Sequence, residues 1–95
     1  MVQPEESAYY KRFGRILRAA RRKRDVTQKQ LGEKLHLTQP IIARCESGER
    51  PVDIVEFVLA ARALGLAPAK LVRRLEKEMF PEDGREQDGS PPVHD

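Results

Sequence analysis

Two Thr-Gln pairs, at residues 27–28 and 38–39, constrain the fold of this chain more than any other feature. Threonine is a favoured N-cap residue, so each pair marks a helix start. An apolar residue precedes each threonine and can pack on the fifth residue after it, as a hydrophobic staple. Because the two starts are so close, the helices must be short and cannot form a long antiparallel hairpin. Residues 27–50 therefore predict two short helices joined by a tight turn.

Other helix starts carry similar signals. Thr27 with Gln30 and Asp53 with Glu56 form capping-box patterns, in which two side chains satisfy unpaired backbone donors. Before them, residues 9–24 have apolar side chains at helical spacing, which predicts an amphipathic first helix. The repeated start signals favour a chain made of short helices.

Helix ends are marked by residues that tolerate a left-handed backbone. Gly48 and Gly65 stand where a helix commonly ends in that conformation. His36 occupies the corresponding place after the second helix, and we expect it to adopt positive φ, as histidine does more often than most residues. Gly32 lies inside a helix, where glycine costs about 1 kcal/mol relative to alanine, which indicates a close approach to a neighbour. The signals together predict five helices, at about 9–24, 28–35, 39–46, 54–64 and 68–79.

The composition fits one small helical domain. Of 95 residues 39% are hydrophobic, and the apolar runs are far shorter than the roughly 20 residues that span a bilayer. The start of the chain lacks the apolar region of a signal peptide, so we expect a cytoplasmic protein without membrane contact. One cysteine, Cys45, excludes an internal disulfide, and only His36 and His94 could join it at a metal. We therefore expect no metal, no cofactor and a buried Cys45 thiol.

Charge is distributed unevenly along the chain. Residues 1–79 hold 17 Lys and Arg against 10 Asp and Glu, a net charge of +7, whereas residues 80–95 have a net charge of −4. A basic body suggests a polyanionic partner, although a solvated helix face would also explain it. We expect a flexible arm at 1–8, a folded domain at 9–79 and a disordered acidic tail at 80–95. The tail could bind a partner, lie against the basic body, or simply solubilise the chain.

Four stretches resemble the Cro/C1-type helix-turn-helix family, also called the XRE family. They are LRAAR at 17–21, TQKQLGEKL at 27–35, LTQPIIARCESGER at 37–50 and IVEFVLAARALGL at 54–66. The resemblance implies an all-α, compact five-helix lambda-repressor-like domain with a helix-turn-helix at helices 2 and 3. It also implies double-stranded DNA as the partner, in a bacterial or phage-derived, nucleoid-associated regulator.

The resemblance assigns DNA contacts to the starts of the two short helices. Gln28 matches a phosphate contact, which the N-terminus of its helix would support. Thr38 caps the recognition helix, and its hydroxyl can reach a phosphate. Gln39 matches a base contact, and glutamine can pair bidentately with adenine, while Arg44 suits guanine.

Other positions carry weaker expectations. Lys29 and Arg50 suit phosphate contacts, and Pro40 and Ala43 could line the groove, although a role in beginning the helix would also explain Pro40. Pro40 and Ile41 replace polar residues frequent in the family, so we expect unusual base readout. The resemblance also pairs Arg21 with Glu46 as a structural ion pair between the first and third helices.

The predicted function is a sequence-specific transcriptional regulator, acting as a homodimer and repressing from a palindromic operator. The candidate dimer surface is the last helix, unless its apolar residues only close the core: Leu71, Val72, Leu75, Met79 and Phe80. The alternative is an antitoxin or phage-type module that neutralises a protein partner. No catalytic constellation and no glycine-rich phosphate loop is present, which argues against an enzyme. We also expect no small-molecule effector, because we expect no second domain to bind one.

Overall fold

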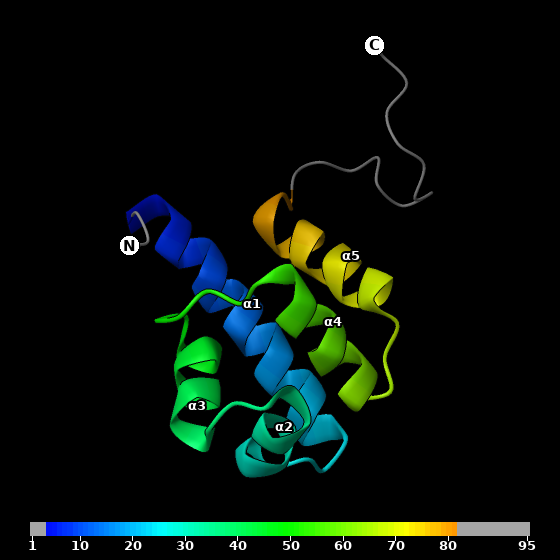
Figure 1. Cartoon of the computed structure of the whole chain (residues 1–95). Coiled ribbons are helices and arrows are strands. Elements are labelled where there is room, and N and C mark those ends of the chain that lie inside the picture. Colours follow the sequence, from blue (N-terminus) through cyan, green and yellow to red (C-terminus); the bar gives the residue numbers. More distant parts are fainter. Residues whose placement is uncertain (1–3, 82–95) are drawn as a thin grey trace.

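Five α-helices follow one another along the chain (Figure 1). The computed structural model describes residues 4–81, and no strand occurs in them. The predicted all-α, five-helix fold is therefore confirmed. None of the described helices is long and apolar enough to cross a membrane. The helices are α1 (Pro4–Lys23), α2 (Gln28–Leu35), α3 (Gln39–Ser47), α4 (Ile54–Ala63) and α5 (Pro68–Met79).

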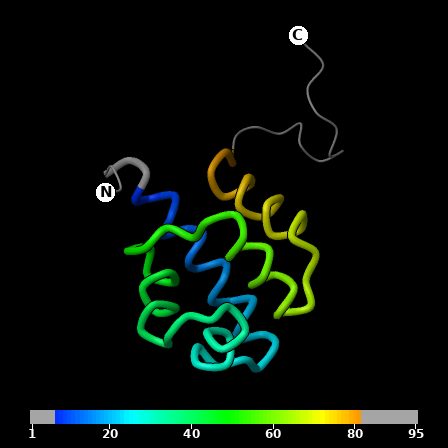
Figure 2. The backbone as a smooth tube through the Cα atoms, viewed as in Figure 1, coloured from blue at the N-terminus to red at the C-terminus, as the bar shows by residue number. Residues whose placement is uncertain are grey.

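The longest helix, α1, lies at the centre of the domain. It packs against α3 on one side and α5 on another, while α2 bridges α3 and α4, and α4 contacts α5 (Figure 2). Leu31, Ile42 and Leu71 are almost completely buried where these helices meet. Full burial of such a side chain contributes about 1.5–3 kcal/mol. The rings of Phe13 and Phe57, with centroids 5.7 Å apart, join α1 to α4.

The first helix begins earlier than predicted. We expected a flexible arm at 1–8 and a helix from about residue 9, but α1 starts at Pro4. That prediction is wrong for residues 4–8, and residues 1–3 lie outside the described part. Proline suits the first position of a helix because its missing N–H would have no partner there, and residues 5–8 have no strong helix breaker.

Most of the predicted helix ends are confirmed. Both capping boxes are complete, at Thr27 with Gln30 and at Asp53 with Glu56. His36 has a left-handed backbone, with φ of 59° and ψ of 38°, and ends α2 as expected. Thr38 occupies the N-cap of α3, but its hydroxyl makes no capping hydrogen bond. The hydroxyl of Thr38 is therefore available to another partner.

Glycine allows two close backbone approaches. A Cβ on Gly32 would clash with the carbonyl oxygen of Leu37 in the turn after α2, which confirms the inferred close approach. A Cβ on Gly14 would clash with the carbonyl oxygen of Glu46. That second approach, which we did not predict, lets α1 lie directly against the backbone of α3.

The candidate dimer residues of α5 divide into two groups. Leu71 is only 1% exposed and belongs to the core of the domain, so its assignment to a dimer surface was wrong. It lies on the side of α5 that faces α1 and α4, where it buries its whole side chain. Leu75 and Met79 are half-buried, and Val72 and Phe80 are exposed. Beyond residue 81, the predicted acidic tail lies outside the described residues.

Candidate nucleic-acid interface

A buried ion pair joins α1 to α3. Arg21 donates from Nε to Oε2 of Glu46 at 2.6 Å and from its second terminal nitrogen to Oε1 at 3.0 Å. Its remaining terminal nitrogen donates to the backbone carbonyl of Val26 at 2.8 Å. Glu46 is only 2% exposed, so its charge needs these donors, and the more exposed Arg18 adds a contact at 3.6 Å. The geometry matches the ion pair that we predicted between Arg21 and Glu46.

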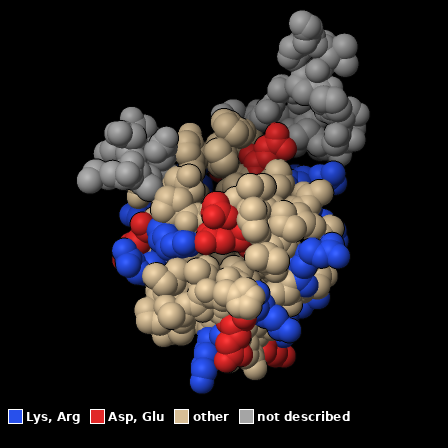
Figure 3. All heavy atoms as spheres, viewed as in Figure 1, with Lys and Arg blue, Asp and Glu red and all other residues tan. Residues whose placement is uncertain are grey.

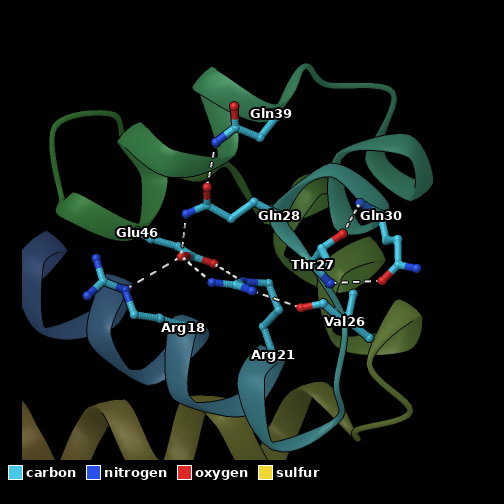
Figure 4. Close-up of polar contacts among 8 residues, drawn as sticks. All are labelled: Arg18, Arg21, Val26, Thr27, Gln28, Gln30, Gln39 and Glu46. Carbon is cyan, nitrogen blue, oxygen red and sulfur yellow. Dashed lines mark hydrogen bonds and ion pairs between the residues drawn. The ribbon is translucent and has the colours of Figure 1, made fainter.

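The same carboxylate extends this network to both Thr-Gln pairs. The amide nitrogen of Gln28 donates to Oε1 of Glu46 at 2.9 Å, and Gln39 donates to the side-chain oxygen of Gln28 at 2.6 Å (Figure 4). Glu46 therefore connects α1, α2 and α3, and the connection ends at an exposed side chain on α3. Sequence reasoning placed Gln28 and Gln39 separately and missed this link. The feature that could have revealed the link is Glu46, because a buried carboxylate has more hydrogen-bond acceptor sites than one arginine can fill.

The link fixes Gln28 without using all the hydrogen-bonding capacity of Gln39. One N–H of the Gln39 amide goes to Gln28, while its second N–H and its oxygen have no hydrogen-bond partner among the described residues. Those are the two groups that a bidentate contact with adenine needs. The network can thus orient Gln39 and leave it able to bind a base.

This pair of glutamines lines an open hollow whose surface is partly polar and partly apolar. It has a volume of about 660 Å³ and includes the N-terminal turn of α2, with Thr27, Gln28 and Lys29 on one side and Arg22 on another. The N-terminus of a helix carries unpaired N–H groups and a partial positive charge. A phosphate group could therefore bind here, and Lys29 lies where we expected such a contact.

The outer surface of α3 carries the remaining predicted base contacts. Gln39, Pro40 and Arg44 are exposed, and Ala43 is half-buried. Nε of Arg44 lies 3.6 Å from Oε1 of Glu49, and both side chains are more than half exposed. Such a surface pair contributes little, so the guanidinium of Arg44 can exchange this partner for another acceptor.

Arg50 has a different environment from the one expected. Its two terminal nitrogens donate to the two oxygens of Glu56 at 3.0 and 2.9 Å, and one also donates to Sγ of Cys45 at 3.3 Å. The hydrogen bond from Arg50 lowers the pKa of Glu56, and the same bond raises the pKa of Arg50. These contacts join the end of α3 to the start of α4, so we assign Arg50 a structural role in place of a phosphate contact.

Cys45 is buried beside this second pair. Its side chain is 3% exposed, which agrees with the predicted core thiol. Burial raises the pKa of the Cys45 thiol, although the hydrogen bond from Arg50 opposes that shift. Among the described residues, no group of three or more His, Cys, Asp or Glu side chains could hold a metal ion.

Two short helices joined by a tight turn, with the exposed face of the second helix beside this hollow, form a helix-turn-helix. Residues 12–75 match the family described as "Helix-turn-helix domain", and the chain belongs to that family. No curated protein matches the sequence.

Solved structures with the same fold are regulatory proteins. The restriction-modification controller protein C.AhdI from Aeromonas hydrophila is 29% identical, with a TM-score of 0.65, over 68% of this chain and 94% of that one. The clp gene regulator ClgR from Corynebacterium glutamicum is 21% identical, with a TM-score of 0.71, over 85% of this chain and 86% of that one. The fold of this chain is thus that of a helix-turn-helix transcriptional regulator.

Proposed function

We propose that the chain is a sequence-specific DNA-binding repressor, acting in the cytoplasm, that places α3 in the major groove of a palindromic operator as a homodimer. The observation that carries this proposal is the hydrogen-bonded link from buried Glu46 through Gln28 to exposed Gln39. It couples the start of α2, suited to a phosphate, to the start of α3, suited to a base. A repressor needs no further module, because occupancy of a promoter is sufficient.

In the proposed complex, α3 supplies the base contacts. Gln39 pairs with adenine through its free N–H and oxygen, and Arg44 leaves Glu49 to pair with guanine O6 and N7. Pro40 and Ala43 line the groove, where an apolar surface can contact a thymine methyl group.

In the proposed complex, contacts to DNA phosphates hold α3 at the depth in the major groove at which its side chains reach the bases. The N-terminal turn of α2, Gln28 and Lys29 contact one phosphate, and the uncapped hydroxyl of Thr38 contacts another. These contacts position the domain on the duplex without reading its sequence.

An exposed apolar surface supports the homodimer. Ile54 and Val55 are 72% and 63% exposed, and Val58 and Leu59 continue the same face of α4 one turn later. Figure 3 shows a largely uncharged area over α4. The dimer surface that we propose is therefore centred on α4, with Val72 and Phe80 of α5 at its edge. It would place two recognition helices at half-sites about 34 Å apart.

The first experiment selects binding sites from random DNA and then tests two α3 side chains. The double substitution Gln39→Ala with Arg44→Ala should weaken binding to the selected site by at least about 30-fold, since each bidentate base contact contributes about 1–3 kcal/mol. Binding to random DNA should change much less. A control pair on exposed positions of α2, Glu33→Ala with Lys34→Ala, should leave the preference for the selected site intact. Unchanged affinity in the α3 variant would contradict the proposal.

A separate experiment tests the dimer. Ile54→Glu with Val55→Glu should shift sedimentation toward the monomer, because two charges would be buried in the contact. Gln30→Glu with Lys34→Glu, on exposed positions of α2, should leave the sedimentation unchanged. A selected site without dyad symmetry, or sedimentation unaffected by the α4 variant, would rule out this dimer.

The apolar surface also allows one alternative function, a module that neutralises a protein partner. An apolar groove of about 470 Å³ opens between α1, α4 and α5 and is lined by Tyr9, Ile54, Phe57, Val72 and Met79, among others. Another protein could use this groove together with the exposed face of α4. Loss of a bound partner protein in Ile54→Glu, with DNA binding retained, would favour that function.

A further inference from the structure

A second basic surface lies away from the helix-turn-helix. A groove of about 330 Å³ runs between the C-terminal end of α1 and α5. Ala20, Leu66 and Leu71 supply its apolar lining. Figure 3 shows Lys and Arg side chains gathered along the edge of the molecule over α5. Six cationic residues line it: Lys23, Arg24, Lys70, Arg73, Arg74 and Lys77.

Among the described residues, no acidic side chain in the lining of this groove balances the positive charge of its Lys and Arg residues. None of its lining residues in the described part carries a carboxylate, and no ion pair of the described structure involves its six cationic residues. Glu76 and Glu78 are exposed on α5 but do not line the groove. Several like charges around one groove attract a polyanion, and low ionic strength strengthens that attraction.

An acidic segment of the same chain begins where this basic helix ends. Residues 82–95 carry five acidic residues and one arginine, a net charge of −4, and they follow α5 by two residues. Fourteen residues can reach about 46 Å when extended, whereas the 12 residues of α5 span about 18 Å. The acidic segment can therefore reach back along the whole groove.

We propose that the acidic segment 82–95 occupies the basic groove between α1 and α5 of its own chain. Its carboxylates neutralise the cations of the groove and shield them from other polyanions. Because the groove lies outside the helix-turn-helix, this contact reduces non-specific attraction to nucleic acid without blocking α3. The contact itself is independent of the proposed repressor function.

Carbodiimide cross-linking tests the contact directly, since it joins a carboxylate to a lysine amine that it touches. In the full chain at low salt, monomeric products should join Glu82, Asp83, Glu86 or Asp88 to Lys23 and Lys70. Lys77 is too close in sequence to be informative. Lys11, Lys29 and Lys34 lie outside the groove and serve as matched controls. Equal cross-linking of the control lysines would overturn the proposal, whether or not the chain binds DNA.

The shielding effect is tested with a random-sequence DNA duplex. A full-length variant with Glu82→Gln, Asp83→Asn, Glu86→Gln and Asp88→Asn should bind that duplex about 10-fold more tightly at low salt, and the gain should shrink at high salt. In a background with Lys70→Gln and Arg74→Gln, two positive charges of the groove are already removed. There the same four changes should alter the affinity for the random duplex by less than about 2-fold.

A matched pair of neutral changes separates this contact from a general effect of net charge. Lys34→Gln with Arg62→Gln removes two exposed cations outside the groove. In that background the gain from neutralising the segment should remain about 10-fold. Equal gains in the groove and control backgrounds would show that the segment acts through net charge alone and would overturn the proposal.

Discussion

The two arginine–glutamate pairs of this domain are both bidentate but have very different surroundings. In the first, Arg21 and Glu46 join α1 to α3, and the side chains are 9% and 0% exposed. In the second, Arg50 and Glu56 join the end of α3 to α4, and the side chains are 30% and 15% exposed. Both arginines donate two hydrogen bonds to one carboxylate.

The difference lies in what else each carboxylate holds. Glu46 also accepts from Gln28, and through it holds Gln39 on the proposed base-reading surface. Glu56 completes the capping box of α4, and its other hydrogen bonds come from Arg50, which has only a structural role. The first pair therefore stabilises the fold and also positions the proposed DNA-binding surface. The second pair only holds the end of α3 against the start of α4. Comparable ion pairs in one small fold can thus have separate roles.

The largest expected effect is on the buried pair. Glu46→Gln leaves the Arg21 charge without a carboxylate, and breaking a buried pair in this way costs about 3–5 kcal/mol. Urea unfolding measures the loss. Glu49→Gln, which removes an exposed carboxylate just beyond α3, is the matched control and should cost less than about 0.5 kcal/mol. A loss below about 1 kcal/mol for Glu46→Gln would contradict the role assigned to this pair.

A smaller effect is expected at the second pair. Glu56→Gln removes the charge but keeps an oxygen for the capping box, so it should cost about 1–3 kcal/mol in urea unfolding. Asp53→Asn keeps the cap of the same helix and should cost less. If Glu56→Gln were as costly as Glu46→Gln, the contrast between the two pairs would not hold.

Acid should weaken the second pair. The hydrogen bond from Arg50 holds the pKa of Glu56 below its ordinary value of 4.5. A carboxylate with a lowered folded-state pKa stabilises the fold above its unfolded-state pKa, and this contribution is lost as pH falls through the folded-state value. The difference in Tm between the unmodified chain and Glu56→Gln should therefore shrink between pH 7 and pH 3, as measured by circular dichroism. A constant difference would show that the charge of Glu56 contributes nothing.

The smallest effect concerns Cys45, which lies between the two pairs on α3. Burial raises the pKa of its thiol, so alkylation of the folded chain by iodoacetamide at pH 8 should be at least about 10-fold slower than alkylation in urea. Mass spectrometry measures both rates. Equal rates would mean that the end of α3 opens freely in the folded chain.

Local signals were sufficient to predict most of the fold. The capping boxes at Thr27 and Asp53 and the left-handed end at His36 depend on residues only a few positions apart, so the sequence displays them directly. The start of α1 was missed because no threonine or aspartate cap marks it, and helix propensity alone allowed Pro4 as the first residue.

Side-chain partners between helices were harder to predict. Arg21 with Glu46 was found by resemblance to a family, and the contacts of Glu46 with Gln28 and of Arg50 with Glu56 were not found. Leu71 could be recognised as apolar, but whether it closed the core or joined a dimer depended on the packing of α5 against α1. The contacts of Glu46 join residues 18 and 25 positions apart, which no local pattern specifies, and the contact of Arg50 with Glu56 depends on the path of the loop between α3 and α4.

The sequence by itself determined where the four helices after α1 start and stop, to within about one residue, and it placed a Thr-Gln pair at the start of both α2 and α3. Only the tertiary structure decided that these pairs are linked, because Gly14 lets α1 approach α3 and brings Arg21 to Glu46. The buried carboxylate then needs more donors than Arg21 supplies and binds Gln28, which in turn holds Gln39. Helix ends follow from backbone hydrogen bonding within a few residues, whereas a buried charge takes its partners from whichever helices pack around it.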